Sequence, residues 1–373
     1  MDLHELRRQL RRTDRAILDA WARRDAITAA IGRLKQTGGR PILDRTQEQR
    51  VIGRARVMAA ERGLSEDRAA RLMALLIESS LGRQEDIRVR AQGLGAGRPA
   101  LVIGGGGLMG RWFCRFLDLQ GYDVHAADPS GGPDGVPTTG DWRETQDAFA
   151  LTVVAAPLGI SCGILEEIAR RKREGLIFDI GSVKAPLGPG LEALSDSGLR
   201  AASVHPLFGP DATVLRGCQV LVMEIGSEEA ADEAEAVFAG TMARVLRIPL
   251  EEHDPLMAYV LGLSHALNLA FVQALSESGE RARRLARLSS VTFNRQLEVT
   301  AAVAGENPHL YYEIQHANPH GGEALEHLAA AVTNLSRIVG EGDESAFVDL
   351  MSAGAAYLAE RAHHTDSAPP DAD

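Results

Sequence analysis

A glycine-rich segment at residues 104–110 has the spacing of a loop that cradles phosphate groups. It follows the apolar run 101–103 and precedes an apolar helical segment, which gives the order strand, loop, helix. Glycines let the backbone turn tightly and approach a pyrophosphate, whose charge the helix N-terminus stabilises. The residues predicted to contact such a cofactor are Gly105, Gly107, Leu108, Met109 and Gly110.

A carboxylate follows the next predicted strand, at residues 122–127. Asp128 stands 18 residues after Gly110, where an acidic side chain can bind the hydroxyl groups of the adenosine ribose. No arginine follows Asp128 directly, so a 2′-phosphate would lack a cation there. The pattern therefore favours NAD over NADP, and the alternative is a glycine-rich turn without a ligand.

His205 stands between the predicted strand 202–204 and Pro206. This is the carboxyl edge of the predicted sheet, where ligands of α/β proteins bind. A neutral imidazole at this edge can accept a hydroxyl proton while a hydride leaves for the cofactor. The alternative is a histidine that only ends a strand.

Positive charge is concentrated in residues 1–90, which contain 19 Arg and one Lys against 13 acidic residues, although the whole chain has a net charge of −11. Arg24 falls within the apolar alternation of the first predicted helix, and a guanidinium buried there needs an anion. Lys35 lies on nearly the same face of that helix, whereas Arg7 lies about 100° away and could serve a neighbouring chain. Alternatively, each cation is solvated or paired internally.

Apolar periodicity divides the chain into segments that must position these residues. Spacings of three and four predict a long first helix, and two more helices complete an all-α domain at residues 1–92. Over 98–249 helical or loop segments alternate with six apolar strand candidates, which predicts a doubly wound α/β sheet of the Rossmann type. The predicted strands are 101–103, 122–127, 151–156, 176–180, 202–204 and 219–224. Residues 250–362 are predicted to be all-α, and 363–373 a disordered tail.

Composition excludes several classes of protein. No apolar run approaches the roughly 20 residues of a membrane span, and no apolar signal segment follows Met1, so we expect no membrane association. Three cysteines without metal-ligand spacing predict a cytoplasmic protein without a metal site. The basic segment contains no DNA-reading motif, so we expect no nucleic acid. A partner-binding or nucleic-acid-binding module fused to a generic dehydrogenase remains the alternative.

Residues 1–90 resemble the all-helical chorismate mutase domain, an intertwined dimer that binds a dicarboxylate. The resemblance implies a rearrangement of chorismate to prephenate that needs no acid or base, only a held conformer and stabilised charge. It assigns Arg7 of a partner chain and Arg24 to the carboxylates, Lys35 and Gln84 to the ether oxygen, Asp44 and Glu48 to the ring hydroxyl, and Ser80 to the pocket wall.

One position departs from the family pattern. Gln47 stands where the family usually has an arginine, just before Glu48. Arg45 or Arg50 compensates, or the mutase is weakened, or the ring substituent of the substrate differs.

Residues 98–360 resemble prephenate dehydrogenase, and the whole chain resembles the bifunctional chorismate mutase/prephenate dehydrogenases of tyrosine biosynthesis. The stretches that carry this similarity are GGGGLMGRWF, DIGSVKAPL, SVHPLFGPD and LSSVTFNRQLE. The resemblance implies oxidation of prephenate by NAD, with loss of CO2, to 4-hydroxyphenylpyruvate. It assigns His205 as the base, Ser182 to orient it and the nicotinamide, Arg295 to a substrate carboxylate, His265 to substrate or inhibitory tyrosine, and Asp211 to the pocket entrance. Tyr311 is a weaker match.

The expected partners are therefore chorismate, prephenate, tyrosine as a feedback inhibitor and a second copy of the chain in a homodimer. Two alternatives stay open. The enzyme could act on 4-amino-4-deoxychorismate and its rearranged product, or the head could be a degenerate mutase attached to an active dehydrogenase.

Overall fold

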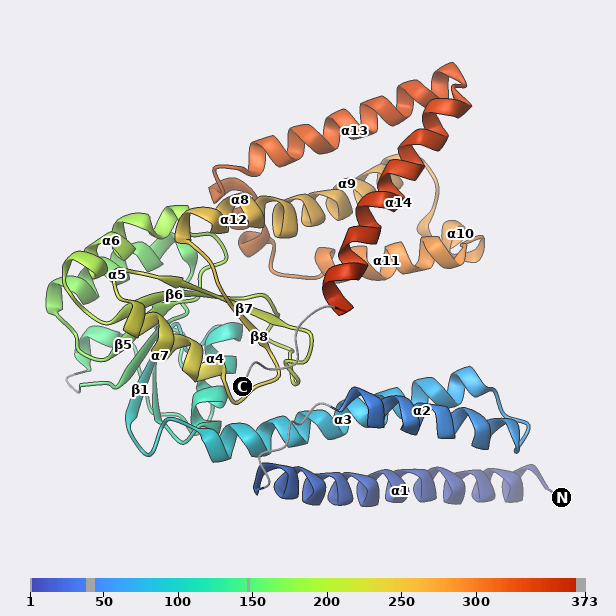
Figure 1. Ribbon diagram of the computed structural model, residues 1–373, viewed down its shortest axis with the longest axis horizontal. Helices are drawn as coiled ribbons and strands as arrows, with labels where there is room; N and C mark the ends of the chain where they lie inside the picture. Colours follow the sequence, from blue (N-terminus) through green and yellow to red (C-terminus); the bar gives the residue numbers. More distant parts are fainter. Residues whose placement is uncertain (1, 38–43, 146–147, 367–373) are drawn as a thin grey trace. The chain divides into compact units, whose positions relative to one another are not determined.

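The computed structural model describes residues 2–37, 44–145 and 148–366. The chain divides into two compact units, Met1–His253 and Asp254–Asp373, which we call unit 1 and unit 2 and describe separately. Unit 1 contains both the predicted helical head and the predicted sheet domain (Figure 1).

Three helices form the head, as predicted: α1 (Leu3–Thr37), α2 (Arg45–Ala60) and α3 (Glu66–Gln92). Asp44 caps α2 by accepting a hydrogen bond from the Gln47 amide, and Ser65 caps α3 in the same way, followed by two acidic residues in the first turn. Both α1 and α2 pack along α3 (Figure 1). Apolar side chains along α1, such as Leu10 and Ile17, stay more than half exposed in the single chain.

An eight-stranded sheet follows, in the order β3-β2-β1-β4-β5-β6-β7-β8. All neighbouring pairs are parallel except β6 and β7. The strands are β1 (Pro99–Ile103), β2 (Asp123–Ala127), β3 (Thr138–Thr139), β4 (Leu151–Val154), β5 (Leu176–Asp179), β6 (Ala201–Pro206), β7 (Gln219–Glu224) and β8 (Arg244–Arg247). The doubly wound sheet is thus confirmed, with β3 and β8 added to the predicted strands.

Helices cover both faces of the sheet (Figure 1). They are α4 (Leu108–Leu119), α5 (Leu158–Arg171), α6 (Gly188–Asp196) and α7 (Glu228–Phe238), with short 3-10 turns at Trp142–Glu144 and Ala185–Leu187. Phe113 and Phe116 of α4 contact Phe238 of α7, which joins these two helices on one face. On the other face α5 packs against α6. The central strands read as continuous apolar runs because both of their faces are buried.

The last helix of unit 1, α8 (Leu250–Met257), continues into unit 2, where a π-helical segment, Ala258–Leu263, follows it. The remaining helices are α9 (Ser264–Glu277), α10 (Ala282–Arg287), α11 (Val291–Ala304), α12 (Pro308–Ala317), α13 (Gly321–Glu341) and α14 (Glu344–Asp366). The all-α prediction for this region is confirmed. Helix α14 passes the predicted boundary at residue 362 by four residues, and the rest of the predicted tail, 367–373, lies outside the described residues.

Candidate functional site

The glycine loop occupies the turn between β1 and α4 and is shaped by close backbone approaches. Gly104 has a φ of +85°, which favours glycine. A Cβ on Gly110 would lie 2.0 Å from the Gly104 carbonyl oxygen, and one on Gly106 would lie 2.2 Å from the Gly131 oxygen. No side chain caps α4 at Gly107, so its first-turn amides are available to an anion. The loop therefore has the shape and polarity of a pyrophosphate cradle.

Asp128 lies just past the end of β2, beside this loop. Its Oδ2 accepts a hydrogen bond from the Gly106 amide at 3.0 Å, and its Oδ1 accepts one from the Ser130 amide at 2.8 Å. Burial works to raise the pKa of Asp128, but the bonds from Ser130 and Gly106 outweigh it and hold that pKa below its usual value. An ionised carboxylate thus stands at the place expected for a ribose contact.

His205 is the penultimate residue of β6, at the same carboxyl edge of the parallel strands as the glycine loop. Its side chain is 3% exposed, and its Nδ1 lies 2.8 Å from Nε2 of His253, which is fully buried on α8. Burial first, and then the positive charge of Lys184 and the nearby His253, hold the pKa of His205 well below 6.5. His205 is therefore a neutral imidazole at pH 7.

A buried ion pair lies behind His205. Lys184 Nζ donates to Asp179 Oδ2 at 2.6 Å and to the Val204 carbonyl oxygen at 2.9 Å. Asp179 also accepts hydrogen bonds from the Ser203 hydroxyl and the Gly181 amide. These contacts tie the loop after β5 to the strand that carries His205, which explains why a chain with only three lysines places one here.

Sequence reasoning missed His253 and Asp179. Asp179 ends a strand whose residues are all buried, and a carboxylate in that position signals a buried partner. His253 lies in an acidic helical turn without periodicity, and no local pattern distinguishes it. Ser182 is half-buried in the loop after β5, and its predicted role in orienting His205 stays a prediction. Asp211 is exposed in the turn after β6.

In the head, the structure brings Arg24, Ser80 and Gln84 together between α1 and α3. The Arg24 guanidinium donates to the Leu76 carbonyl oxygen at 2.5 Å and to the Ser80 hydroxyl. Gln84 is 8% exposed, and its Oε1 is buried with no hydrogen-bond partner among the described residues. A buried, unpaired amide oxygen one helical turn from Ser80, which the guanidinium contacts, is the arrangement of a site that a polar ligand completes.

The other predicted residues of the head lie around this cluster or far from it. Lys35 is half-buried in the last turn of α1, and Glu48 forms an ion pair with Arg216 of the sheet domain at 2.9 Å. Asp44 is the exposed cap of α2. Arg7 is exposed and lies about 26 Å along α1 from Arg24, given 1.5 Å per helical residue. One chain therefore cannot bring Arg7 and Arg24 to the same small ligand.

In unit 2, His265 of α9 stacks on Tyr311 of α12 with ring centroids 4.3 Å apart. Burial lowers the pKa of His265, and its Nδ1 has no partner among the described residues. Asn268 of α9 accepts hydrogen bonds from Gln296 and Thr300 and so joins α9 to α11. Arg295, next to Gln296, is exposed on α11.

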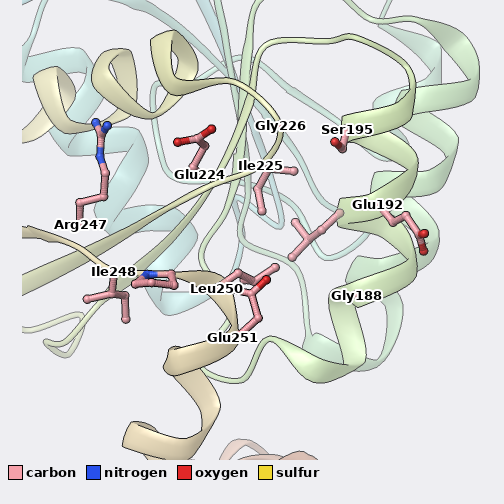
Figure 2. A pocket seen from close by; sticks show the side chains of 12 residues that line it. Gly188, Glu192, Ser195, Glu224, Ile225, Gly226, Arg247, Ile248, Leu250 and Glu251 are labelled. Carbon is pink, nitrogen blue, oxygen red and sulfur yellow. The ribbon is translucent and has the colours of Figure 1, made fainter.

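A cavity of about 530 Å³ opens elsewhere in unit 1, between α6 and the ends of β7 and β8. Figure 2 shows Glu192 and Ser195 of α6 on one side of it and Arg247 and Ile248 on the other. None of the predicted site residues lines this cavity, and Arg247 is already paired with Asp232 and Glu235. We therefore do not place the chemistry there.

The fold, the sheet edge with the glycine loop and His205, and the Arg24, Ser80 and Gln84 cluster together define a dinucleotide-binding oxidoreductase with an anion-binding helical domain attached. Comparison with known families agrees. The family "Chorismate mutase type II" matches residues 6–85, and "Prephenate dehydrogenase, dimerization domain" matches residues 249–353.

Three relatives show how the similarity is distributed. A T-protein of Enterobacter agglomerans is 26% identical over 93% of this chain and 90% of its own length. A 4-amino-4-deoxyprephenate dehydrogenase of Streptomyces pristinaespiralis is 30% identical over 68% of this chain and 88% of its own length. A probable arogenate/prephenate dehydrogenase of Methanocaldococcus jannaschii is 27% identical over 70% of this chain, and the match spans 61% of that relative's length.

Among solved structures, a prephenate dehydrogenase from A. aeolicus in complex with hydroxyphenyl propionate and NAD+ has a TM-score of 0.58 at 18% identity. The match covers 70% of this chain and 98% of the A. aeolicus chain. The chain belongs to the bifunctional chorismate mutase/prephenate dehydrogenase family.

The family match also bears on one apolar segment. The helical run Leu250–Glu277 has a mean hydropathy of 1.5 over its most apolar window and is long enough, by length and composition alone, to cross a membrane. It lies wholly within the match to the dimerization domain. Its exposed apolar residues include Leu256 and Val260.

Proposed function

We propose that this chain rearranges chorismate to prephenate in its head and oxidatively decarboxylates prephenate to 4-hydroxyphenylpyruvate in its second site, with NAD as cofactor, as a cytoplasmic homodimer. The observation that carries this proposal is the neutral, buried His205 at the same sheet edge as the glycine loop. The Arg24, Ser80 and Gln84 cluster supports the mutase half.

In the head, the protein's task is to hold the compact conformer of the substrate. Arg24 binds one carboxylate, and Arg7 of a second copy binds the other, because the two arginines of one chain lie too far apart. Lys35 donates a hydrogen bond to the ether oxygen, where negative charge develops as the bond breaks. Gln84 donates there once its side-chain amide turns Nε2 from the Ser80 carbonyl oxygen, its partner at 3.3 Å, into the pocket. No proton is transferred, so the site needs no general acid or base.

The residues around the glycine loop fit NAD. The backbone amides at the start of α4 would hold the pyrophosphate, and Asp128 would accept hydrogen bonds from the ribose hydroxyls. When bound, NAD supplies the hydride acceptor.

His205 supplies the base in the second site. For Nε2 of His205 to accept a proton from the substrate, its Nδ1 must carry the ring proton and donate a hydrogen bond to His253. Nε2 then accepts the proton of the C4 hydroxyl as that carbon is oxidised, and loss of the ring carboxylate as CO2 makes the ring aromatic. Arg295 binds a substrate carboxylate, Ser182 orients His205 and the nicotinamide, and Asp211 lies at the entrance. His265 faces substrate or tyrosine as an inhibitor.

The test supplies purified protein with chorismate and NAD+ and follows chorismate loss and NADH formation together, with prephenate as the control substrate. NADH from chorismate supports both activities. NADH from prephenate alone would overturn the mutase half and leave the dehydrogenase half standing. No NADH from either substrate would overturn the whole proposal.

A second candidate has the same chemistry with amino-substituted substrates. Gln47 replaces the arginine that the family usually has beside Glu48, and a relative at 30% identity is a 4-amino-4-deoxyprephenate dehydrogenase. A neutral glutamine near the ring substituent does not repel an ammonium group of the substrate, whereas an arginine guanidinium would. A kcat/KM for 4-amino-4-deoxyprephenate above that for prephenate would favour this candidate.

A further inference from the structure

The loop that follows His205 reaches from the sheet domain to the head. This loop, residues 207–218, is pinned to the sheet by the Leu207 amide, which donates to the Gln219 carbonyl oxygen at 2.9 Å. It is pinned to α4 by Trp112, whose Nε1 donates to the Ala212 carbonyl oxygen at 2.9 Å. The sheet domain therefore fixes the position of the far end of this loop.

At that far end the loop is held to α3 by Glu85, which is next to Gln84. The Glu85 side chain is 4% exposed, and its Oε2 accepts a hydrogen bond from the Leu215 amide at 2.9 Å. Its other oxygen accepts one from the Met242 amide, in a second loop of the sheet domain. One buried carboxylate thus fixes two sheet-domain loops against the helix that carries Ser80 and Gln84.

Arg216, one residue beyond Leu215, enters the head. Its Nη2 lies 2.9 Å from Glu48 Oε2, and the two side chains are 39% and 17% exposed. Glu48 is one of the residues assigned to the mutase pocket, and its Oε1 is buried without a hydrogen-bond partner among the described residues. A sheet-domain arginine therefore holds one oxygen of this carboxylate and leaves the other for a ligand hydroxyl.

The sequence of α2 gives this contact its meaning. Position 47, on the same helix and adjacent to Glu48, is an uncharged glutamine. We propose that Arg216 is a positioning residue of the mutase site, which orients Glu48 and supplies from the sheet domain the positive charge that Gln47 does not. This inference rests on the proposed mutase function of the head.

The test compares full-length Arg216→Ala and Arg216→Lys with the wild type for chorismate mutase kinetics. Because Arg216 acts through Glu48 on substrate binding, we expect Arg216→Ala to raise KM for chorismate about five- to tenfold and to change kcat less than threefold. Lysine restores the charge but not the planar fork, so Arg216→Lys should recover part of the loss. Combined with Glu48→Gln, Arg216→Ala should add almost no further effect.

Arg200→Ala is the matched control, since Arg200 forms a comparable ion pair with Glu233 at 2.6 Å, away from the head. It should leave chorismate KM unchanged, and neither arginine variant should change the dehydrogenase constants with prephenate. If the wild type turns over chorismate, equal KM values for chorismate in Arg216→Ala and Arg200→Ala would overturn the role of Arg216.

The wild type separates this inference from the proposed function. If the wild type does not turn over chorismate, the mutase proposal fails, and chorismate binding by calorimetry then decides on Arg216. Weaker binding by Arg216→Ala than by Arg200→Ala would support its role at a non-catalytic site. Equal or absent binding in all three proteins would overturn it.

Discussion

His253 Nε2 lies 2.8 Å from His205 Nδ1, so a side chain on α8 contacts one ring nitrogen of the histidine near the end of β6. This contact orients the imidazole, and when Nδ1 is the donor, Nε2 is left to accept a proton. Because both rings are buried, water does not compete for this bond.

We expect His205→Asn to lower the dehydrogenase kcat by about 10²–10⁴-fold, since only proton transfer is removed. KM for prephenate should stay nearly constant, because the carboxylate contacts remain. Initial rates of NADH formation with prephenate give both constants. Chorismate loss in the same preparation is the control for folding, and an unchanged kcat would move the base to another residue.

Replacement of His253 should separate orientation from packing. A glutamine can present an amide oxygen near the place of Nε2, so His253→Gln should keep kcat within about fivefold, whereas His253→Leu should lower it about ten- to a hundredfold. In the wild type, the acid limb of kcat/KM should lie below pH 6.5, because the pKa of His205 is lowered. Equal kcat values for the two variants would contradict the orienting role.

Burial of His205 also predicts a loss of stability in acid. Its pKa is below 6.5 in the folded protein and ordinary in the unfolded chain, so from pH 6.5 downward the unfolded state binds more protons. The free energy of unfolding should therefore fall as pH drops below 6.5, by up to about 1.4 kcal/mol per pH unit for this one group. Urea unfolding at pH 7.5 and 5.5 measures it, and His205→Asn should show a smaller difference.

Lys35→Ala should lower the mutase rate by about two orders of magnitude or more, because one donor to a developing oxyanion is worth about 3 kcal/mol. The dehydrogenase reaction with prephenate should be unaffected. Chorismate disappearance is the measurement. A rate within threefold of the wild type would remove Lys35 from the site.

A methyl group in the glycine loop should weaken cofactor binding selectively. In Gly106→Ala the new Cβ would lie 2.2 Å from the Gly131 oxygen and 2.8 Å from Asp128 Cγ, so the loop must shift. We expect KM for NAD+ to rise about tenfold or more, with mutase activity unchanged. Gly140→Ala, which meets no atom within 4 Å, is the control. Equal KM values for the two variants would argue against this loop as the cofactor cradle.

Much of the fold follows from sequence periodicity, because long amphipathic helices and buried strands leave strong patterns. The long α1 and the apolar strands β1, β4 and β5 are of this kind. The missed strands are short or polar at their ends: β3 has two residues, and β8 reads Arg-Val-Leu-Arg. Their pairing with β2 and β7 stabilises them, and such tertiary support is invisible in a local pattern.

Among the residues of the site, too, some could be predicted from the sequence and others could not. Residues inside a motif, such as Gly107 and His205, could be predicted because the motif and the strand end place them at one sheet edge. His253 and Arg216 could not, because each reaches its partner across more than forty residues of sequence. Only the packing of α8 and of the loop after β6 brings them into contact.

The way Glu85 joins the head to the sheet domain bears on how the two halves can diverge. Its carboxylate accepts from the backbone amides of residues 215 and 242, not from their side chains. Mutational drift at those two positions therefore leaves the donors in place, provided that the loops keep their path and gain no proline. On the side of the head, by contrast, both hydrogen bonds depend on the single side chain of Glu85. Because Leu215 is 4% exposed and Met242 packs against the apolar cluster of α3, we expect lineages that keep the fusion to exchange these two only for other apolar residues while retaining an acidic residue at 85.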